Sequence, residues 1–70
     1  MQEKKVKAAA AYGMISLRKI AEELNTSPQN LSNRLKRGSL KRADMERIAE
    51  ILGAEYVLEE YFIFPDGTKI

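Results

Sequence analysis

The chain has 70 residues, enough for one domain, and a fold of this size buries only roughly 60% of its surface, so its core alone gives marginal stability. It contains no Cys and no His, which excludes a disulfide framework and a zinc site of the usual ligands, and leaves oligomerisation as the expected source of extra stability. The net charge of +2 divides unevenly: residues 1–53 carry eleven Lys and Arg against six acids, giving +5, whereas residues 54–70 carry one Lys against four acids, giving −3. A basic body suits an anionic partner.

The first predicted helix covers residues 2–12, whose lysine-rich and then alanine-rich composition favours helix. Gly13 follows it as a C-terminal stop. Val6, Ala9 and Ala10 are expected to face inward.

Ser16 is positioned to cap a second helix. Apolar residues follow it at spacings i, i+3, i+4 and i+7, which predicts a buried stripe made of Leu17, Ile20, Ala21 and Leu24. Asn25 is expected to end this helix, because Asn tolerates the left-handed backbone conformation that usually requires Gly.

A third helix is predicted at about residues 28–37, separated from the second by a tight turn only. Ser27 is a good N-cap, and Pro28 suits the first helical position because its missing N–H is not needed there. Gly38 provides the C-terminal stop.

A fourth helix is predicted within "LKRADMERIAEILG", which ends at Gly53. Its inward residues are expected to be Met45, Ile48, Ala49 and Leu52. Its start is less clear, because Ala43 stands where a capping oxygen would form a capping box with Glu46, and Ser39 is the alternative cap.

After Gly53 the residues become aromatic and β-branched, in "EYVLEEYFIF", and "FPDGT" is a turn sequence. We expect a C-terminal β-hairpin that pairs Phe62 with Ile70 and Phe64 with Thr68.

The third helix carries amides, hydroxyls and cations but no carboxylate. At about 100° per residue, Leu31 and Leu35 define its buried side. The opposite side carries Gln29, Asn33, Lys36 and Arg37, with Asn30 beside the buried stripe. Amide side chains pair with adenine edges, Arg pairs with guanine, and Lys and Arg neutralise phosphates, so this composition is typical of a DNA-contacting surface.

Residues 16–37, "SLRKIAEELNTSPQNLSNRLKR", resemble the helix-turn-helix of the Cro and phage-repressor type, the Xre-like transcriptional regulators. The resemblance extends over residues 2–53, with Ala21 at the tight contact between the helices, Asn25 in the turn and Leu31 as the buried residue of the recognition helix. It implies a mainly α, lambda-repressor-like compact four-helix domain that places the recognition helix in the major groove of double-stranded DNA.

The chain departs from the family pattern at several positions. Leu17 replaces a phosphate-contacting Gln that the family often has, which transfers that contact to Ser16, Arg18 or the helix N-terminus. Asn25 replaces the usual turn glycine, and Thr26 replaces the commoner aliphatic residue. Pro28 occupies a position that often reads a base, so it offers only an apolar contact.

Two sets of DNA contacts are predicted on this basis. The base-reading residues are Gln29, Asn30, Asn33 and Arg37. The residues predicted to contact the DNA backbone are Ser16, Arg18, Ser27, Arg34, Lys36, Lys41 and Arg42. The alternative for each is an ordinary solvated surface residue.

The tail, residues 54–70, is a predicted dimerisation element attached to the body, residues 1–53, within a single domain. We expect a strand over residues 55–64 that is apolar on both faces at Tyr61, Phe62, Ile63 and Phe64. Its unpaired backbone edge would pair with a second copy, while its acids stay away from phosphates. The alternative is a hairpin that packs only on its own helices.

Other functions are less consistent with these residues. No run approaches the roughly 18 apolar residues of a membrane span, and no secretory signal is evident, so a soluble, cytoplasmic protein is expected. Without His, Cys or a Gly-rich phosphate loop an enzyme is not expected, and Glu59 and Glu60 would face opposite sides of a strand. No cofactor, metal or small-molecule ligand is predicted. The expected function is that of a repressor-like regulator, and the alternative is a protein-interaction or antitoxin-like adaptor on the same scaffold.

Overall fold

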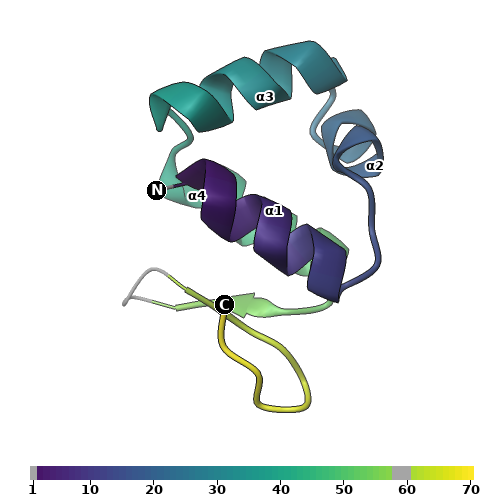
Figure 1. The fold of residues 1–70 in the computed structure, drawn as a ribbon, viewed down its shortest axis with the longest axis vertical. Helices are drawn as coiled ribbons and strands as arrows, with labels where there is room; N and C mark the ends of the chain where they lie inside the picture. The colour runs from purple at the N-terminus through teal and green to yellow at the C-terminus, as the bar shows by residue number, and fades with distance from the viewer. Residues whose placement is uncertain (1, 58–60) are drawn as a thin grey trace.

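The computed structural model describes residues 2–57 and 61–70. The chain is mainly helical, with a small antiparallel sheet (Figure 1). The elements are, in order, α1 (Gln2–Tyr12), α2 (Leu17–Glu23), α3 (Pro28–Arg37), α4 (Arg42–Leu52), β1 (Glu55–Tyr56) and β2 (Phe62–Ile63). Helix α3 lies at one end of the molecule, α1 and α4 lie in the middle, and the sheet lies at the other end (Figure 1).

The caps of α2 and α3 and the stops of α3 and α4 agree with the sequence prediction. Ser16 and Ser27 cap α2 and α3, with their hydroxyl oxygens accepting from the backbone N–H groups of Lys19 and Asn30. Gly38 and Gly53 end α3 and α4 in the left-handed conformation, as predicted. These stops depend on local backbone chemistry, which explains why the sequence alone locates them.

The end of α1 differs in one respect from the prediction. The helix stops at Tyr12, but Met14, at φ 58°, is the residue that adopts the left-handed conformation after it. Gly13 has no positive φ, and a Cβ atom there would lie 3.4 Å from the Leu52 side chain, which is an ordinary contact distance. Met14 is 91% exposed.

The predicted start of α4 at Ser39 is wrong. The N-cap is Lys41, and the Asp44 carboxylate accepts a hydrogen bond of 3.2 Å from the Lys41 backbone N–H. The Ser39 hydroxyl instead donates to the Arg34 carbonyl oxygen at 3.3 Å, so it helps to close α3. A short loop between two helices offers the Ser39 hydroxyl carbonyl acceptors at the end of α3 and N–H donors at the start of α4, and sequence does not decide between them.

One hydrophobic core joins all four helices to the tail. The inward residues predicted for α1 and α4 are buried, and in α2 Ile20 and Ala21 are buried, whereas Leu17 and Leu24 are half-buried. The buried apolar residues are Val6, Ala9, Ala10, Ile20, Ala21, Leu31, Leu35, Leu40, Met45, Ile48, Ala49, Leu52, Phe62 and Phe64. Two tail aromatics thus complete the core of the helical body.

The predicted C-terminal hairpin is confirmed. Phe62 and Ile70 exchange two backbone hydrogen bonds of 2.8 and 2.9 Å, and the Phe64 N–H donates to the Thr68 carbonyl at 2.9 Å. Gly67 adopts a positive φ of 89° in the turn. The Tyr12 ring packs edge-on against Phe64, with centroids 4.7 Å apart, which fastens the hairpin to α1.

The Tyr12 hydroxyl also binds the turn of the hairpin. It donates to the Asp66 carboxylate and shares a 2.9 Å hydrogen bond with the Thr68 hydroxyl. The Tyr12 hydroxyl and then the Thr68 backbone N–H lower the pKa of Asp66 below its ordinary value. Because the pKa is lowered in the folded state, this contact stabilises the fold above the unfolded-state pKa and loses its effect as the pH falls through the folded-state pKa.

The open strand edge predicted for a dimer interface is not found at β2. Part of the predicted strand, residues 58–60, lies outside the described residues, and with it the two adjacent glutamates. The flanking segments form two strands, with Tyr56 paired to Phe62 and Glu55 to Ile63. β2 therefore has β1 on one side and the return segment to Ile70 on the other, so it has no open backbone edge.

The side chains of the predicted interface are also largely taken up by the core. Phe62 is fully buried and Phe64 is 5% exposed. Tyr61 is half-buried, with the Lys69 ammonium 5.5 Å from its ring centroid, and Ile63 is half-buried as well. The alternative in which the hairpin packs on its own helices agrees with these contacts.

Candidate nucleic-acid interface

The α2–α3 pair is joined by a short turn with defined backbone geometry. Asn25 adopts a φ of 62°, as predicted from its tolerance of the left-handed region. The Thr26 N–H donates to the Ala21 carbonyl at 2.9 Å, so the turn closes directly on α2. Ala21 is fully buried, and α2 packs against both α3 and α4. The position of α3 is therefore fixed by contacts at its N-terminal end.

The outward side of α3 carries four of the predicted contact residues. Gln29, Asn33, Lys36 and Arg37 are all exposed, while Leu31 and Leu35 are buried beneath them. The Arg37 Nε–H makes a long hydrogen bond of 3.4 Å to the Asn33 carbonyl. The remaining guanidinium N–H groups stay available to an acceptor in solution. This surface has two amides and two cations with no carboxylate on the same helix.

The cations of α3 also have a purely structural effect. Arg34, Lys36 and Arg37 lie in the last turn, where positive charge opposes the partial negative charge of a helix C-terminus. That effect alone does not account for the amides at Gln29 and Asn33, since amide side chains carry no charge. The two observations together favour a ligand that offers both hydrogen-bonding edges and negative charge.

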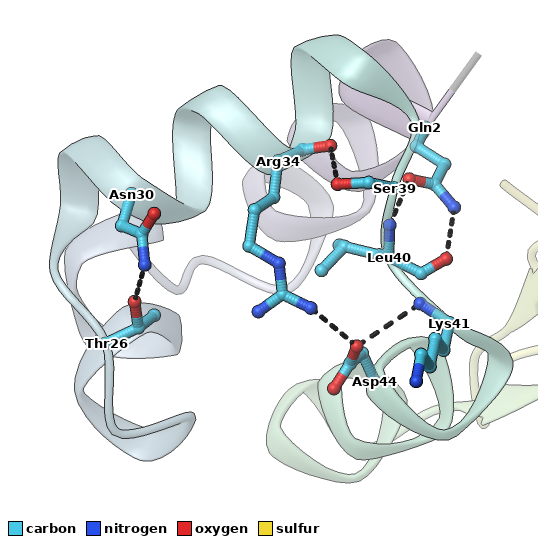
Figure 2. Close-up of polar contacts among 8 residues, drawn as sticks. All are labelled: Gln2, Thr26, Asn30, Arg34, Ser39, Leu40, Lys41 and Asp44. Atoms are coloured by element: carbon cyan, nitrogen blue, oxygen red, sulfur yellow. Dashed lines mark hydrogen bonds and ion pairs between the residues drawn. The ribbon is translucent and has the colours of Figure 1, made fainter.

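Asn30 lies on the side of α3 that faces the turn. Its Nδ2 group donates a 2.8 Å hydrogen bond to the Thr26 hydroxyl (Figure 2). Its backbone N–H donates to the Ser27 hydroxyl at 3.1 Å. Residues Thr26 and Ser27 thus hold both the side chain and the backbone of Asn30. The sequence predicted the Ser27 cap but not the Thr26 contact.

Arg34 is held by α4 and is less available than predicted. Its Nη2 group lies 2.9 Å from the Asp44 carboxylate, and both side chains are about one-third exposed (Figure 2). The same Asp44 oxygen accepts from the Lys41 backbone N–H. Asp44 therefore links the C-terminal half of α3 to the start of α4, and a phosphate at Arg34 would have to compete with this carboxylate.

Arg42 points toward the tail. Its Nε–H lies 3.1 Å from the Glu46 carboxylate, and its guanidinium lies 5.2 Å from the centroid of the Tyr56 ring. A cation over an aromatic ring is attracted to its face. A phosphate at Arg42 would therefore have to compete with Glu46 and with the Tyr56 ring.

The other residues predicted to contact the DNA backbone lie near the starts of α2, α3 and α4. Arg18, in the first turn of α2, and Lys41, before α4, are both exposed. Ser16 and Ser27 use their hydroxyl oxygens as acceptors for capping, which leaves each hydroxyl hydrogen free to donate. The Lys19 ammonium forms an ion pair with Glu23 at 3.2 Å, and Lys19 is not among the residues predicted to contact the DNA backbone.

Gln2 is a positioning residue that sequence reasoning missed. Its side-chain amide donates to the Leu40 carbonyl at 2.9 Å and accepts from the Leu40 N–H at 3.1 Å (Figure 2). Both backbone polar groups of Leu40, whose side chain is buried, are satisfied in this way. The amide thereby ties the N-terminal end of α1 to the loop between α3 and α4, and no local pattern around Gln2 predicts a partner 38 residues away.

Replacing Gln2 with Ala is expected to lower the free energy of unfolding by about 1–2 kcal/mol, because two partly buried hydrogen bonds are lost. Gln2→Glu keeps the acceptor for the Leu40 N–H but places a carboxylate oxygen against the Leu40 carbonyl, so it should be no more stable than Gln2→Ala. Urea unfolding followed by circular dichroism measures both values. A Gln2→Ala protein as stable as the unchanged one would contradict the bridging role.

The described residues contain neither a metal-binding group nor a membrane span. Across residues 2–57 and 61–70, no three His, Cys, Asp or Glu side chains are arranged to hold a metal ion. Within the same ranges, every helix is too short and too polar to cross a bilayer.

Comparisons with protein-family models, with curated proteins and with solved structures give no match for this chain.

Proposed function

We propose that the protein is a sequence-specific double-stranded DNA-binding regulator in which α2 and α3 act as a helix-turn-helix. Helix α3 would enter the major groove, and α2 would cross the DNA backbone. The observation that carries the proposal is the outward side of α3, where Gln29 and Asn33 lie beside Lys36 and Arg37 with no carboxylate on the helix. Amides suit base edges and cations suit phosphates.

The arrangement of the rest of the molecule supports this proposal. Strand β1, which contains Glu55, lies at the end opposite α3 (Figure 1), so this carboxylate would be remote from a duplex that contacts α3. Arg18 and Lys41 are exposed near the starts of α2 and α4, where they would flank the groove-facing helix. As a regulator, such a protein would act by occluding or repositioning other factors at its DNA site.

A fluorescence anisotropy titration of random and selected duplexes tests the proposal at about 50 mM and about 200 mM salt. The apparent affinity is expected to fall steeply with salt, because phosphate contacts release counterions. Absence of binding to either duplex at the lower salt concentration would contradict the proposal.

Substitutions on α3 are expected to separate base contacts from phosphate contacts. Gln29→Ala or Asn33→Ala should weaken binding to the selected duplex by about 1–3 kcal/mol and leave binding to random DNA nearly unchanged. Lys36→Ala or Lys41→Ala, at positions predicted to contact the DNA backbone, should weaken binding to both duplexes and reduce the salt slope by roughly one unit. Arg47→Ala is the matched control, because Arg47 is an exposed cation on the groove between α4 and β1. Equal losses on both duplexes for Gln29→Ala would contradict base reading.

A homodimer stays part of the proposal, although the strand edge first predicted for it is occupied. One copy with one recognition helix reads only a few base pairs, and two copies about 34 Å apart are the common solution for this type of motif. The titration gives the number of protein copies bound per duplex, and two copies per selected duplex are expected at saturation.

A protein-interaction or antitoxin-like module is the second candidate. It is favoured by an open groove of about 410 Å³ between α4 and β1, lined by Ala43, Glu46, Arg47, Ala49, Glu50, Ala54, Glu55 and Tyr56. The groove lies on the part of the molecule that the DNA proposal does not use. Loss of DNA binding at low salt, with the fold intact, would favour this candidate.

A further inference from the structure

An ion pair between Arg34 and Asp44 joins the flank of α3 to the start of α4. The Arg34 Nη2 group lies 2.9 Å from an Asp44 carboxylate oxygen, and Figure 2 shows the Arg34 side chain extending from α3 to Asp44. The same oxygen accepts from the Lys41 backbone N–H at 3.2 Å, so the carboxylate is also held by its own helix. The side chains of Arg34 and Asp44 are 32% and 31% exposed. The pair is therefore defined in position and still accessible from solvent.

Arg34 lies on the side of α3 that would face one wall of the major groove. It follows Asn33 directly, so it lies about 100° around the helix from that outward amide. A helix with its side chains is about 10–12 Å across and the major groove is about 12 Å wide, so a helix that presents Asn33 to the bases brings its flanks close to phosphates. A guanidinium group binds phosphate well. In the protein alone, the partner of Arg34 is a carboxylate instead.

We infer that Asp44 is an internal competitor of DNA phosphate for Arg34, and that it limits the part of the DNA affinity that does not depend on sequence. The inference rests on the proposed function. When the protein binds a duplex, Arg34 has to leave Asp44 before it can contact a phosphate. The energy of the ion pair is then lost, and an unpaired carboxylate remains beside the DNA backbone. Both effects weaken binding, and they act equally on random and selected duplexes because both carry the same phosphates.

Three variants at position 44 separate the charge of the side chain from its shape. Asp44→Asn removes the charge and keeps a side-chain oxygen that can accept from the Lys41 N–H. Asp44→Glu and Asp44→Gln form a second pair of equal size, and both residues suit this third position of a helix. Glu50→Gln is the control for net charge, because Glu50 is an exposed carboxylate on α4 beside β1. Thermal unfolding of each variant establishes that the fold is intact.

The probes are the random and selected duplexes, titrated by fluorescence anisotropy at about 50 mM and about 200 mM salt. Asp44→Asn and Asp44→Gln are expected to lower the Kd for both duplexes by about two- to fivefold at the lower salt concentration, because an ion pair this exposed competes by no more than that factor. The salt slope should become steeper by roughly one unit, as for one added phosphate contact. Asp44→Glu, which keeps the carboxylate, and Glu50→Gln should each change the Kd by less than about twofold.

The dependence of this gain on Arg34 distinguishes competition from a general effect of charge. In an Arg34→Ala background, Asp44→Asn should change the Kd by less than about twofold, because no guanidinium group remains to be released. The salt slope should also stay the same in this background. An equal gain with and without Arg34 would overturn the inference, since Asp44 would then act on the duplex through its charge alone.

A second result would also overturn the inference while leaving DNA binding itself intact. If folded Asp44→Asn and Asp44→Gln proteins bind random duplex no more tightly than the unchanged protein, Asp44 does not compete for Arg34. Weaker binding by both would mean that the carboxylate orients Arg34 toward a phosphate rather than withholding it. If the unchanged protein binds no duplex at the lower salt concentration, the proposed function fails and this inference fails with it.

Discussion

Replacing Phe62 with Ala is expected to lower the free energy of unfolding by about 3–5 kcal/mol, the largest effect of any single change considered for this chain. Phe62 is fully buried, its ring lies 5.1 Å from that of Tyr56, and its backbone pairs with Ile70. Truncation to Ala removes most of a large side chain from the core. The surrounding helices cannot move enough to fill the cavity that it leaves. For 70 residues the total free energy of unfolding is roughly 3.5–10 kcal/mol, so the variant should be largely or wholly unfolded.

Urea unfolding followed by far-ultraviolet circular dichroism measures this loss. Phe62→Leu keeps most of the buried volume and is expected to lose less, so it gives a value even where the Ala variant does not fold. Met14→Ala is the control, since Met14 is a long apolar side chain that is 91% exposed, and it should change stability by no more than about 0.5 kcal/mol. A Phe62→Ala protein of normal stability would mean that the tail is not part of the core.

The same contacts explain why the tail cannot be removed to test for a dimer. A chain that ends at Gly53 lacks both Phe62 and Phe64, which are buried against the helices. Such a truncation would change folding and association together. The mass of the full-length protein in solution is therefore the informative measurement, and substitutions at exposed positions are preferable to deletions.

Most of the helical fold was predictable because its signals are local. Caps at Ser16 and Ser27, left-handed stops at Asn25, Gly38 and Gly53, and the spacing of buried residues all act within a few positions of one another. The return of the hairpin was predictable for the same reason, since Pro and Gly determine its turn. The pairing of Tyr56 with Phe62 was not, because "EYVLEEYFIF" contains no turn sequence that would divide it into two strands.

The candidate site was predicted in composition but not in its connections. The exposed residues of α3 follow from helical periodicity once Leu31 and Leu35 are assigned to the core. The contacts from Arg34 to Asp44, from Arg42 to Tyr56 and from Gln2 to Leu40 depend on how separate helices pack. Long polar side chains reach partners in several directions, so their sequence neighbours do not identify the partner.

Replacing Ala21 with Leu is expected to lower both stability and DNA binding, because Ala21 is fully buried on α2, which packs against α3. Its side chain is fully buried, and its carbonyl oxygen accepts from the Thr26 N–H at 2.9 Å, so the backbone on either side of the turn has little room to move. A Leu side chain there would overpack the contact at a cost of about 1–3 kcal/mol. The strain would shift α3 relative to α2, and under the proposed function it would disturb the two surfaces that contact one duplex.

The matched control is Ala8→Leu, the same change at an exposed position within α1, which should leave both properties nearly unchanged. Urea unfolding gives the stability of each variant, and anisotropy on the selected duplex gives its affinity. If Ala21→Leu is as stable as Ala8→Leu, the two helices are not packed closely at this position. If it is destabilised but binds DNA with normal affinity, the spacing of α2 and α3 is not what presents α3 to the groove. Stability and DNA affinity are expected to fall together because Ala21 affects both the packing of α2 against α3 and the placement of the outward side of α3.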